Sequence, residues 1–149
     1  MPRLSIATVG QIFSGDADQA MPTVLIADDV PDVRELISLT LSPEAYRVLE
    51  ATDGDMAWTM IQEHHPEVVV LDVLMPGRTG LELTKAIRDD PTLASTYVIL
   101  LSAAAQPAQV HAGLAAGADR YMIKPFSLVE FLDAVLEGLQ SRHPKPGAP

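Results

Sequence analysis

The sequence predicts an α/β fold in which five parallel strands form one doubly wound sheet with helices on both faces. From residue 23 onward, short runs rich in apolar and β-branched residues alternate with longer stretches of helical period. Strict alternation of five such pairs favours parallel strands joined by crossover helices. The 149 residues are enough to bury one continuous core, so a single domain is the simplest organisation.

Each element has its own local signal. The predicted strands span residues 23–27, 46–51, 67–72, 97–102 and 119–123, and the predicted helices span residues 31–41, 53–64, 80–89, 107–116 and 127–140. Pro31 suits the first position of a helix. Thr79 with Glu82, and Ser127 with Glu130, have the spacing of a capping box, in which two side chains bond free backbone N–H groups at a helix start.

The two ends of the chain differ from this pattern. Residues 1–21 show no sustained period, and we expect them to be a flexible N-terminal extension of a domain that spans residues 22–140. Residues 141–149 are rich in proline and glycine, as a tail or linker is. We expect no effector domain between residue 140 and residue 149, so the chain is expected to be either a stand-alone unit or a fragment of a longer protein.

Composition excludes several classes of function. Twenty acidic against ten basic residues give a formal net charge of -10, which opposes direct binding to a nucleic acid backbone. The absence of cysteine excludes disulfides and a thiolate nucleophile. No apolar run approaches the roughly 18 to 20 residues of a membrane span, and the start of the chain makes a poor secretory signal. A cytoplasmic location fits these features.

Polar residues fall where the predicted strands end. Asp28 and Asp29 follow the first strand, Asp72 ends the third, Ser102 ends the fourth, and Lys124 follows the fifth. Ligands of open parallel sheets bind beyond the carboxyl ends of the strands. We therefore expect these five side chains to meet at one edge of the sheet.

Three acids at one place require a positive partner. Left alone, the carboxylates would repel one another and raise one another's pKa, whereas a divalent cation such as Mg²⁺, or alternatively Mn²⁺, suits an all-oxygen site. A different interpretation is that Asp28 or Asp29 caps the helix beginning near Pro31, but this leaves Asp72 unexplained. Lys124 interrupts an apolar segment, and its ammonium would complete the charge balance.

In their order and spacing these residues resemble the receiver domains of two-component response regulators, the CheY-like superfamily. The segments that carry the resemblance are "VLIADD", "LDVLMPGRTGLEL", "ILLSA" and "AGADRYMIKPF". It covers roughly residues 22–140 and implies the flavodoxin-like strand order 2-1-3-4-5. It also implies a signalling switch that catalyses only its own phosphorylation and dephosphorylation, rather than an enzyme with a separate substrate.

The resemblance implies a role for each site residue. Asp72 would be the phosphorylation site, accepting the phosphoryl group in a Mg²⁺-dependent reaction. Asp28, Asp29 and Asp72 would hold the metal through their side chains, with Asp28 acting directly or through water, and Leu74 would hold it through its backbone carbonyl. Lys124 would stabilise the phosphoryl oxygens.

The remaining implied roles concern the switch. Ser102 would bond the attached phosphoryl group, and Tyr121 would rotate inward as Ser102 moves. The Lys124–Pro125 bond would be cis and would aim the lysine into the site.

The resemblance also implies the partners. A histidine kinase or a histidine phosphotransfer protein would supply the phosphoryl group. The output face, formed in the family by the fourth helix, fifth strand and fifth helix (α4-β5-α5), would contact a downstream protein or output domain, with a phosphorylation-dependent homodimer as an open alternative. That face corresponds roughly to residues 107–140 and includes, with some core positions among them, Val110, Leu114, Tyr121 and Phe131. Contact with nucleic acid would be indirect, and no membrane is involved.

The sequence departs from the family pattern at a few positions. Val30 and Pro31 stand where many relatives have another polar group, which would weaken metal binding slightly. Leu74 and Ala104 occupy the positions that influence an attacking water in the family, and neither side chain forms hydrogen bonds. We therefore predict slow intrinsic loss of the phosphoryl group.

Other functions are less consistent with the residues. A haloacid-dehalogenase-like phosphatase also uses an aspartate nucleophile and Mg²⁺, but it needs a second acid where Leu74 stands. A flavodoxin-like electron carrier is disfavoured because the acidic segment after the first strand would repel a flavin phosphate. A nucleotide hydrolase is disfavoured because no Walker sequence is present. A degenerate receiver that acts only as a protein-interaction module is a further alternative.

Overall fold

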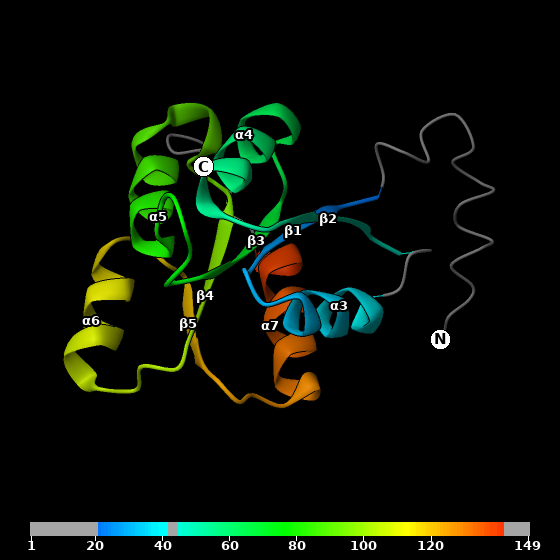
Figure 1. The fold of residues 1–149 in the computed structure, drawn as a ribbon. Coiled ribbons are helices and arrows are strands. Elements are labelled where there is room, and N and C mark those ends of the chain that lie inside the picture. Colours follow the sequence, from blue (N-terminus) through cyan, green and yellow to red (C-terminus); the bar gives the residue numbers. More distant parts are fainter. Residues whose placement is uncertain (1–20, 42–44, 142–149) are drawn as a thin grey trace.

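The computed structural model describes residues 21–41 and 45–141, which form one five-stranded sheet between two layers of helices (Figure 1). The strands are β1 (Thr23–Ala27), β2 (Arg47–Ala51), β3 (Val68–Asp72), β4 (Tyr97–Ser102) and β5 (Arg120–Ile123). The helices are α3 (Pro31–Thr40), α4 (Gly54–His64), α5 (Gly80–Asp89), α6 (Pro107–Ala115) and α7 (Leu128–Ser141), with a 3-10 helix η2 (Pro91–Leu93). Neighbouring strands run parallel in the order β2-β1-β3-β4-β5, which confirms the predicted fold and strand order.

The sheet separates two hydrophobic cores. Helices α3 and α7 cover one face, and α4, α5 and α6 cover the other (Figure 1). Successive strand residues point to opposite faces, so Leu25 packs with Ile61 of α4, whereas Ile26 packs with Ile37 of α3 and Phe131 of α7. All five side chains are fully buried, and burial of each contributes roughly 1.5 to 3 kcal/mol. The central strands are apolar on both sides because both faces are covered.

The predicted element boundaries agree closely with the structure. Strands β1 and β4 and helix α5 have the predicted bounds. The remaining elements differ by one residue: β2, β3, β5 and α4 begin one residue later, α3 and α6 end one residue earlier, and α7 both begins and ends one residue later. Helix η2 was not predicted. It begins at Pro91, and the side chain of its N-cap residue, Asp90, accepts a hydrogen bond from the Thr92 N–H at 2.9 Å.

The helix starts follow the predicted capping signals at α5. The Thr79 hydroxyl accepts from the Glu82 N–H at 3.1 Å, and the Glu82 carboxylate accepts from the Thr79 N–H at 2.9 Å, which completes the capping box. At α7, the Ser127 hydroxyl accepts from the Glu130 N–H at 2.9 Å, the first of the two bonds of such a box. Both contacts satisfy N–H groups that a helix leaves free.

Helix α3 begins differently from the interpretation in which an aspartate caps it. Its N-cap residue is Val30, with no side-chain hydrogen bond to the helix start. Asp28 instead accepts from the Val30 N–H at 2.9 Å, within the turn itself. The capping interpretation is therefore wrong, because the aspartates precede the N-cap position by one and two residues.

The strand register brings the predicted site residues to one edge of the sheet. Asp72 pairs with Leu101, and Ser102 pairs with Ile123, so the ends of β3, β4 and β5 are nearly level. Asp28 and Lys124 directly follow β1 and β5. The carboxyl ends of four strands thus deliver their polar residues to the same place.

The predicted terminal segments fall almost wholly outside the described residues. Residues 1–20 and 142–149 are not described, so the flexible extension and the tail stay predictions. Helix α7 continues to Ser141, one residue beyond the predicted domain boundary, which itself stays a prediction. Across residues 21–41 and 45–141, no helix has both the length and the apolar character needed to cross a membrane.

Candidate functional site

Asp72 is the central acid of the site. It is the last residue of β3, and it is only 8% exposed. Two backbone hydrogen bonds, each 2.9 Å long, fix the position of the next residue, Val73. Its N–H donates to the Leu101 carbonyl, and its carbonyl accepts from the Gly80 N–H. A nearly buried carboxylate at a strand end is costly unless charged partners compensate it.

Two further acids lie beside Asp72. Asp28 is fully buried and Asp29 is exposed, and each of the three carboxylates offers one oxygen within 4.8 Å of the others. This grouping of hard oxygen donors fits a divalent cation such as Mg²⁺, which prefers carboxylates and retained water. The exposed Asp29 leaves the group open to solvent on one side, where water ligands have room.

Lys124 supplies the compensating charge. Its Nζ lies 2.9 Å from Asp28 Oδ2 and 3.4 Å from Asp72 Oδ2, so the ammonium bridges the two buried acids. The Lys124 N–H donates to the Ser102 carbonyl at 2.8 Å, which fixes the start of the segment after β5. The Lys124–Pro125 peptide bond is cis.

The pKa values of Asp72 and Lys124 are both raised in the fold. Burial, followed by the charge of Asp28, raises the pKa of Asp72 from 3.8 to about 6, although Lys124 and a backbone bond from Leu74 oppose the shift. Burial alone would lower the pKa of Lys124, but the hydrogen bond to Asp28 and the charges of Asp72 and Asp28 together raise it. Lys124 is therefore charged at neutral pH, and Asp72 titrates close to neutrality.

Ser102 and Tyr121 both form hydrogen bonds with the segment that follows β4. Ser102 is buried at the end of β4, and its hydroxyl accepts from the Ala104 N–H at 2.9 Å. The Tyr121 hydroxyl donates to the Ala104 carbonyl, also at 2.9 Å. Both predicted switch residues thus contact the same residue, so a movement of this segment changes the surroundings of both.

The segment after β3 is held against the start of α4. The Gly54 N–H donates to the Pro76 carbonyl at 2.9 Å, and Gly77 adopts a positive φ of 77° that suits glycine. The Arg78 guanidinium stacks 5.2 Å from the centre of the Trp58 ring. Leu74, in the same segment, is 74% exposed.

The residues named for the output face have different positions. Leu114 is 45% exposed, and Val110 and Tyr121 are half-buried. Phe131 is fully buried in the core under α7, so it is one of the core positions expected among these residues. Its position in α7 matches the apolar period of that helix.

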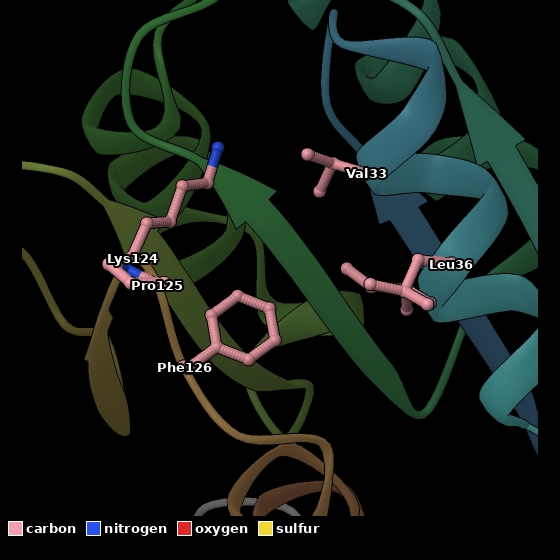
Figure 2. A pocket seen from close by; sticks show the side chains of 6 residues that line it. Val33, Leu36, Lys124, Pro125 and Phe126 are labelled. Atoms are coloured by element: carbon pink, nitrogen blue, oxygen red, sulfur yellow. The ribbon is translucent and has the colours of Figure 1, made fainter.

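An apolar pocket of about 410 Å³ next to the site was not predicted (Figure 2). Val33 and Leu36 of α3 face Lys124, Pro125 and Phe126 across it. Its lining is Val33, Leu36, Ile37, Lys124, Pro125 and Phe126. These residues come from segments that are almost ninety positions apart, so no local pattern indicates the pocket.

A second unpredicted feature is the contact made by Arg34 of α3. Its Nη1 donates to the backbone carbonyl of Asp28 at 2.7 Å, and its Nε lies 3.6 Å from a carboxylate oxygen of Glu50 in β2. The one available signal was a basic residue within the first turns of a helix that follows an acidic pair. This signal is weak, because such residues are common on solvated helix faces.

Comparison with known proteins now decides the family. Residues 24–136 match the family model described as the response regulator receiver domain. The chain belongs to this family. The receiver domain is 40% identical over 108 residues to the response regulator GtcR of Aneurinibacillus migulanus, covering 72% of this chain and 43% of the relative. It is 37% identical over 117 residues to the phosphate regulon transcriptional regulatory protein PhoB of Pseudomonas aeruginosa, covering 76% and 51%.

Solved structures agree with this membership. The receiver domain resembles the chemotaxis response regulator CheY4 of Vibrio cholerae with a TM-score of 0.73 and 32% identity, covering 79% of this chain and 98% of that one. The chain spans about half the length of the curated relatives given above. The predicted response regulator receiver class is confirmed, and the phosphatase alternative is not favoured.

Proposed function

We propose that this receiver domain accepts a phosphoryl group on Asp72 in a Mg²⁺-dependent reaction and transmits the change to a protein partner. The observation that carries the proposal is the position of Asp72. It is nearly buried at the end of β3, within reach of two other carboxylates and 3.4 Å from the Lys124 ammonium. Such an arrangement is costly as a purely structural feature, but it is suited to a carboxylate nucleophile.

The proposed reaction is a direct transfer. An oxygen of ionised Asp72 forms a bond to phosphorus while the phosphorus–nitrogen bond of a phosphohistidine breaks, and the imidazole leaves with the electron pair and takes up a proton. Lys124 stabilises the charge on the transferring oxygens, because its ammonium already lies beside Asp72 Oδ2. Asp28, Asp29 and Asp72, together with the Leu74 carbonyl, would hold Mg²⁺, which would supply further charge neutralisation.

The proposed switch uses the segment after β4. The Ser102 hydroxyl is engaged by the Ala104 N–H, and in our proposal it turns to bond the phosphoryl group. This movement displaces Ala104, whose carbonyl holds the Tyr121 hydroxyl, so Tyr121 rotates inward. A local charge change is thereby converted into a different surface over α6, β5 and α7.

The proposed partners contact two sides of the site. A histidine kinase or phosphotransfer protein approaches Asp72, and the neighbouring pocket in Figure 2 offers it an apolar surface to bury. A downstream protein or output domain, or a second copy of the chain after phosphorylation, contacts the face formed by α6, β5 and α7. The proposal places the chain in the cytoplasm, with no direct contact to nucleic acid.

Phosphoryl uptake tests the proposed function. With acetyl phosphate and Mg²⁺, we expect incorporation of one phosphoryl group in an acid-labile linkage, as in an acyl phosphate, measured by intact mass. Asp72→Asn should abolish it, whereas Asp133→Asn, at an exposed acid on α7, should not. Uptake that persists in Asp72→Asn, or none in the natural chain, would refute the proposal. Steady turnover of a phosphate monoester would instead favour a phosphatase.

The lifetime of the phosphoryl group provides a separate prediction. The two side chains flanking the site, Leu74 and Ala104, are apolar, so neither holds an attacking water by a hydrogen bond. We expect the phosphorylated chain to lose its phosphoryl group over many minutes or longer, followed by intact mass after removal of the phosphodonor. A half-life of seconds in Mg²⁺ buffer would contradict this. Leu74→Asn should shorten the lifetime, because an amide can hold water.

A further inference from the structure

Arg34 forms a hydrogen bond with the backbone between Asp28 and Asp29. It lies in the second turn of α3, and its side chain is only 15% exposed. The guanidinium reaches back toward β1, where Nη1 donates to the Asp28 carbonyl at 2.7 Å. This carbonyl belongs to the peptide that joins Asp28 to Asp29. The bond therefore fixes the plane of the one peptide that both candidate metal ligands share.

The turn is also held at its start, where the Asp28 N–H donates to the Ala51 carbonyl of β2 at 3.3 Å. Val30, the N-cap residue of α3, makes no side-chain bond to the helix start. Within the turn, Asp28 Oδ1 accepts from the Val30 N–H at 2.9 Å, which fixes one carboxylate relative to the backbone. Arg34 fixes the backbone itself relative to α3. Together these contacts determine the directions in which Asp28 and Asp29 leave the chain.

Glu50 completes the arrangement. One of its carboxylate oxygens lies 3.6 Å from Arg34 Nε, and the other accepts from the Ser38 hydroxyl at 2.8 Å. Glu50 belongs to β2 and pairs with Ile26 of β1, so it anchors the guanidinium to the sheet. Its negative charge also offsets that of Arg34, which would otherwise repel a cation bound nearby.

We propose that Arg34 is a positioning residue for the metal site, acting through the Asp28–Asp29 peptide. This inference rests on the proposed function, because it requires that the acids bind Mg²⁺. Groups that orient metal ligands typically change metal affinity by about 10- to 100-fold when they are removed. If Arg34 were merely half of a surface ion pair, its removal would have little effect, since Glu50 is 44% exposed.

The sign of the effect separates positioning from simple electrostatics. Removal of a positive charge near a cation site should tighten cation binding if charge alone matters. Loss of positioning should weaken it. We expect Arg34→Gln to weaken Mg²⁺ binding by about tenfold, against the electrostatic trend. Arg34→Met, which keeps the apolar stem, provides a second variant and should show the same loss.

Calorimetric titration of Mg²⁺ into the unphosphorylated full chain measures this directly, without any phosphodonor. The matched control is Arg47→Gln, which removes the same charge from an exposed position on β2. Weakened binding in both Arg34 variants, with unchanged binding in the control, would support the proposal. Equal or tighter binding in a folded Arg34 variant would overturn it while leaving the proposed function intact. Absence of Mg²⁺ binding in the natural chain would overturn both.

Discussion

Alanine in place of Gly54 is expected to lower the free energy of unfolding by about 3 kcal/mol. A Cβ at this position would lie 1.8 Å from the Arg78 carbonyl oxygen and 2.6 Å from the Arg78 carbonyl carbon. Both are backbone atoms, so no side chain can rotate to make room. The segment after β3 must move away from α4, which also breaks the bond from the Gly54 N–H to the Pro76 carbonyl.

The displaced segment is the one that carries Leu74 next to Asp72. Gly54→Ala should therefore weaken Mg²⁺ binding as well as stability, measured by urea unfolding and by calorimetry. Asp55→Ala is the matched control, because it removes only an exposed carboxylate 3.7 Å from Arg78 and should cost less than about 1 kcal/mol. A Gly54 variant as stable as the control would mean that this segment has no fixed position against α4.

The fold was largely predictable because its signals are local. Residues 97–102 are apolar up to the closing Ser102 and follow the polar pair Ser95-Thr96. They are buried along their whole length, and the structure gives β4 these bounds. Thr79 and Glu82 specify the start of α5 by a reciprocal pair of bonds between residues three positions apart. Errors of one residue arose at edges such as Tyr46, which is half-buried before β2, where burial changes gradually along the chain.

The site was predictable only in part. The strand ends and the resemblance together placed Asp28, Asp72 and Lys124 at one edge of the sheet, and the structure brings them into contact. That Lys124 lies closer to Asp28 than to Asp72 depends on distances across the sheet, which no sequence pattern contains. The bond from Arg34 to a backbone carbonyl was likewise hidden, because every residue offers a carbonyl and sequence does not indicate which one is reached.

Replacement of Asp72 by asparagine is expected to stabilise the metal-free protein at pH 8. The pKa of Asp72 in the fold is about 6, against an ordinary value of 3.8, so the fold disfavours the ionised form. A difference of about two pH units, at about 1.4 kcal/mol each, gives an upper limit near 3 kcal/mol. Asparagine resembles the protonated acid in shape and removes the repulsion from Asp28, while Lys124 keeps Asp28 as its partner.

The pH dependence has a definite sign. Because the folded-state pKa is raised, the stability associated with protonated Asp72 is fully present below the ordinary value of 3.8 and is lost as pH rises through about 6. The advantage of Asp72→Asn over the natural chain should therefore grow across this interval and level off above it. Urea unfolding in a chelator at several pH values measures the difference.

Asp29→Asn is the control for Asp72→Asn, since it removes the same charge from an exposed position at the same edge and should change stability by less than about 0.5 kcal/mol. On the proposed function, Mg²⁺ should reverse the ranking, because a cation that binds the ionised site of the natural chain stabilises that fold by mass action. An Asp72→Asn variant less stable than the natural chain at pH 8 without metal would show that Lys124 compensates the buried charge in full. The ionised Asp72 carboxylate would then cost the fold no electrostatic free energy that a bound cation could relieve.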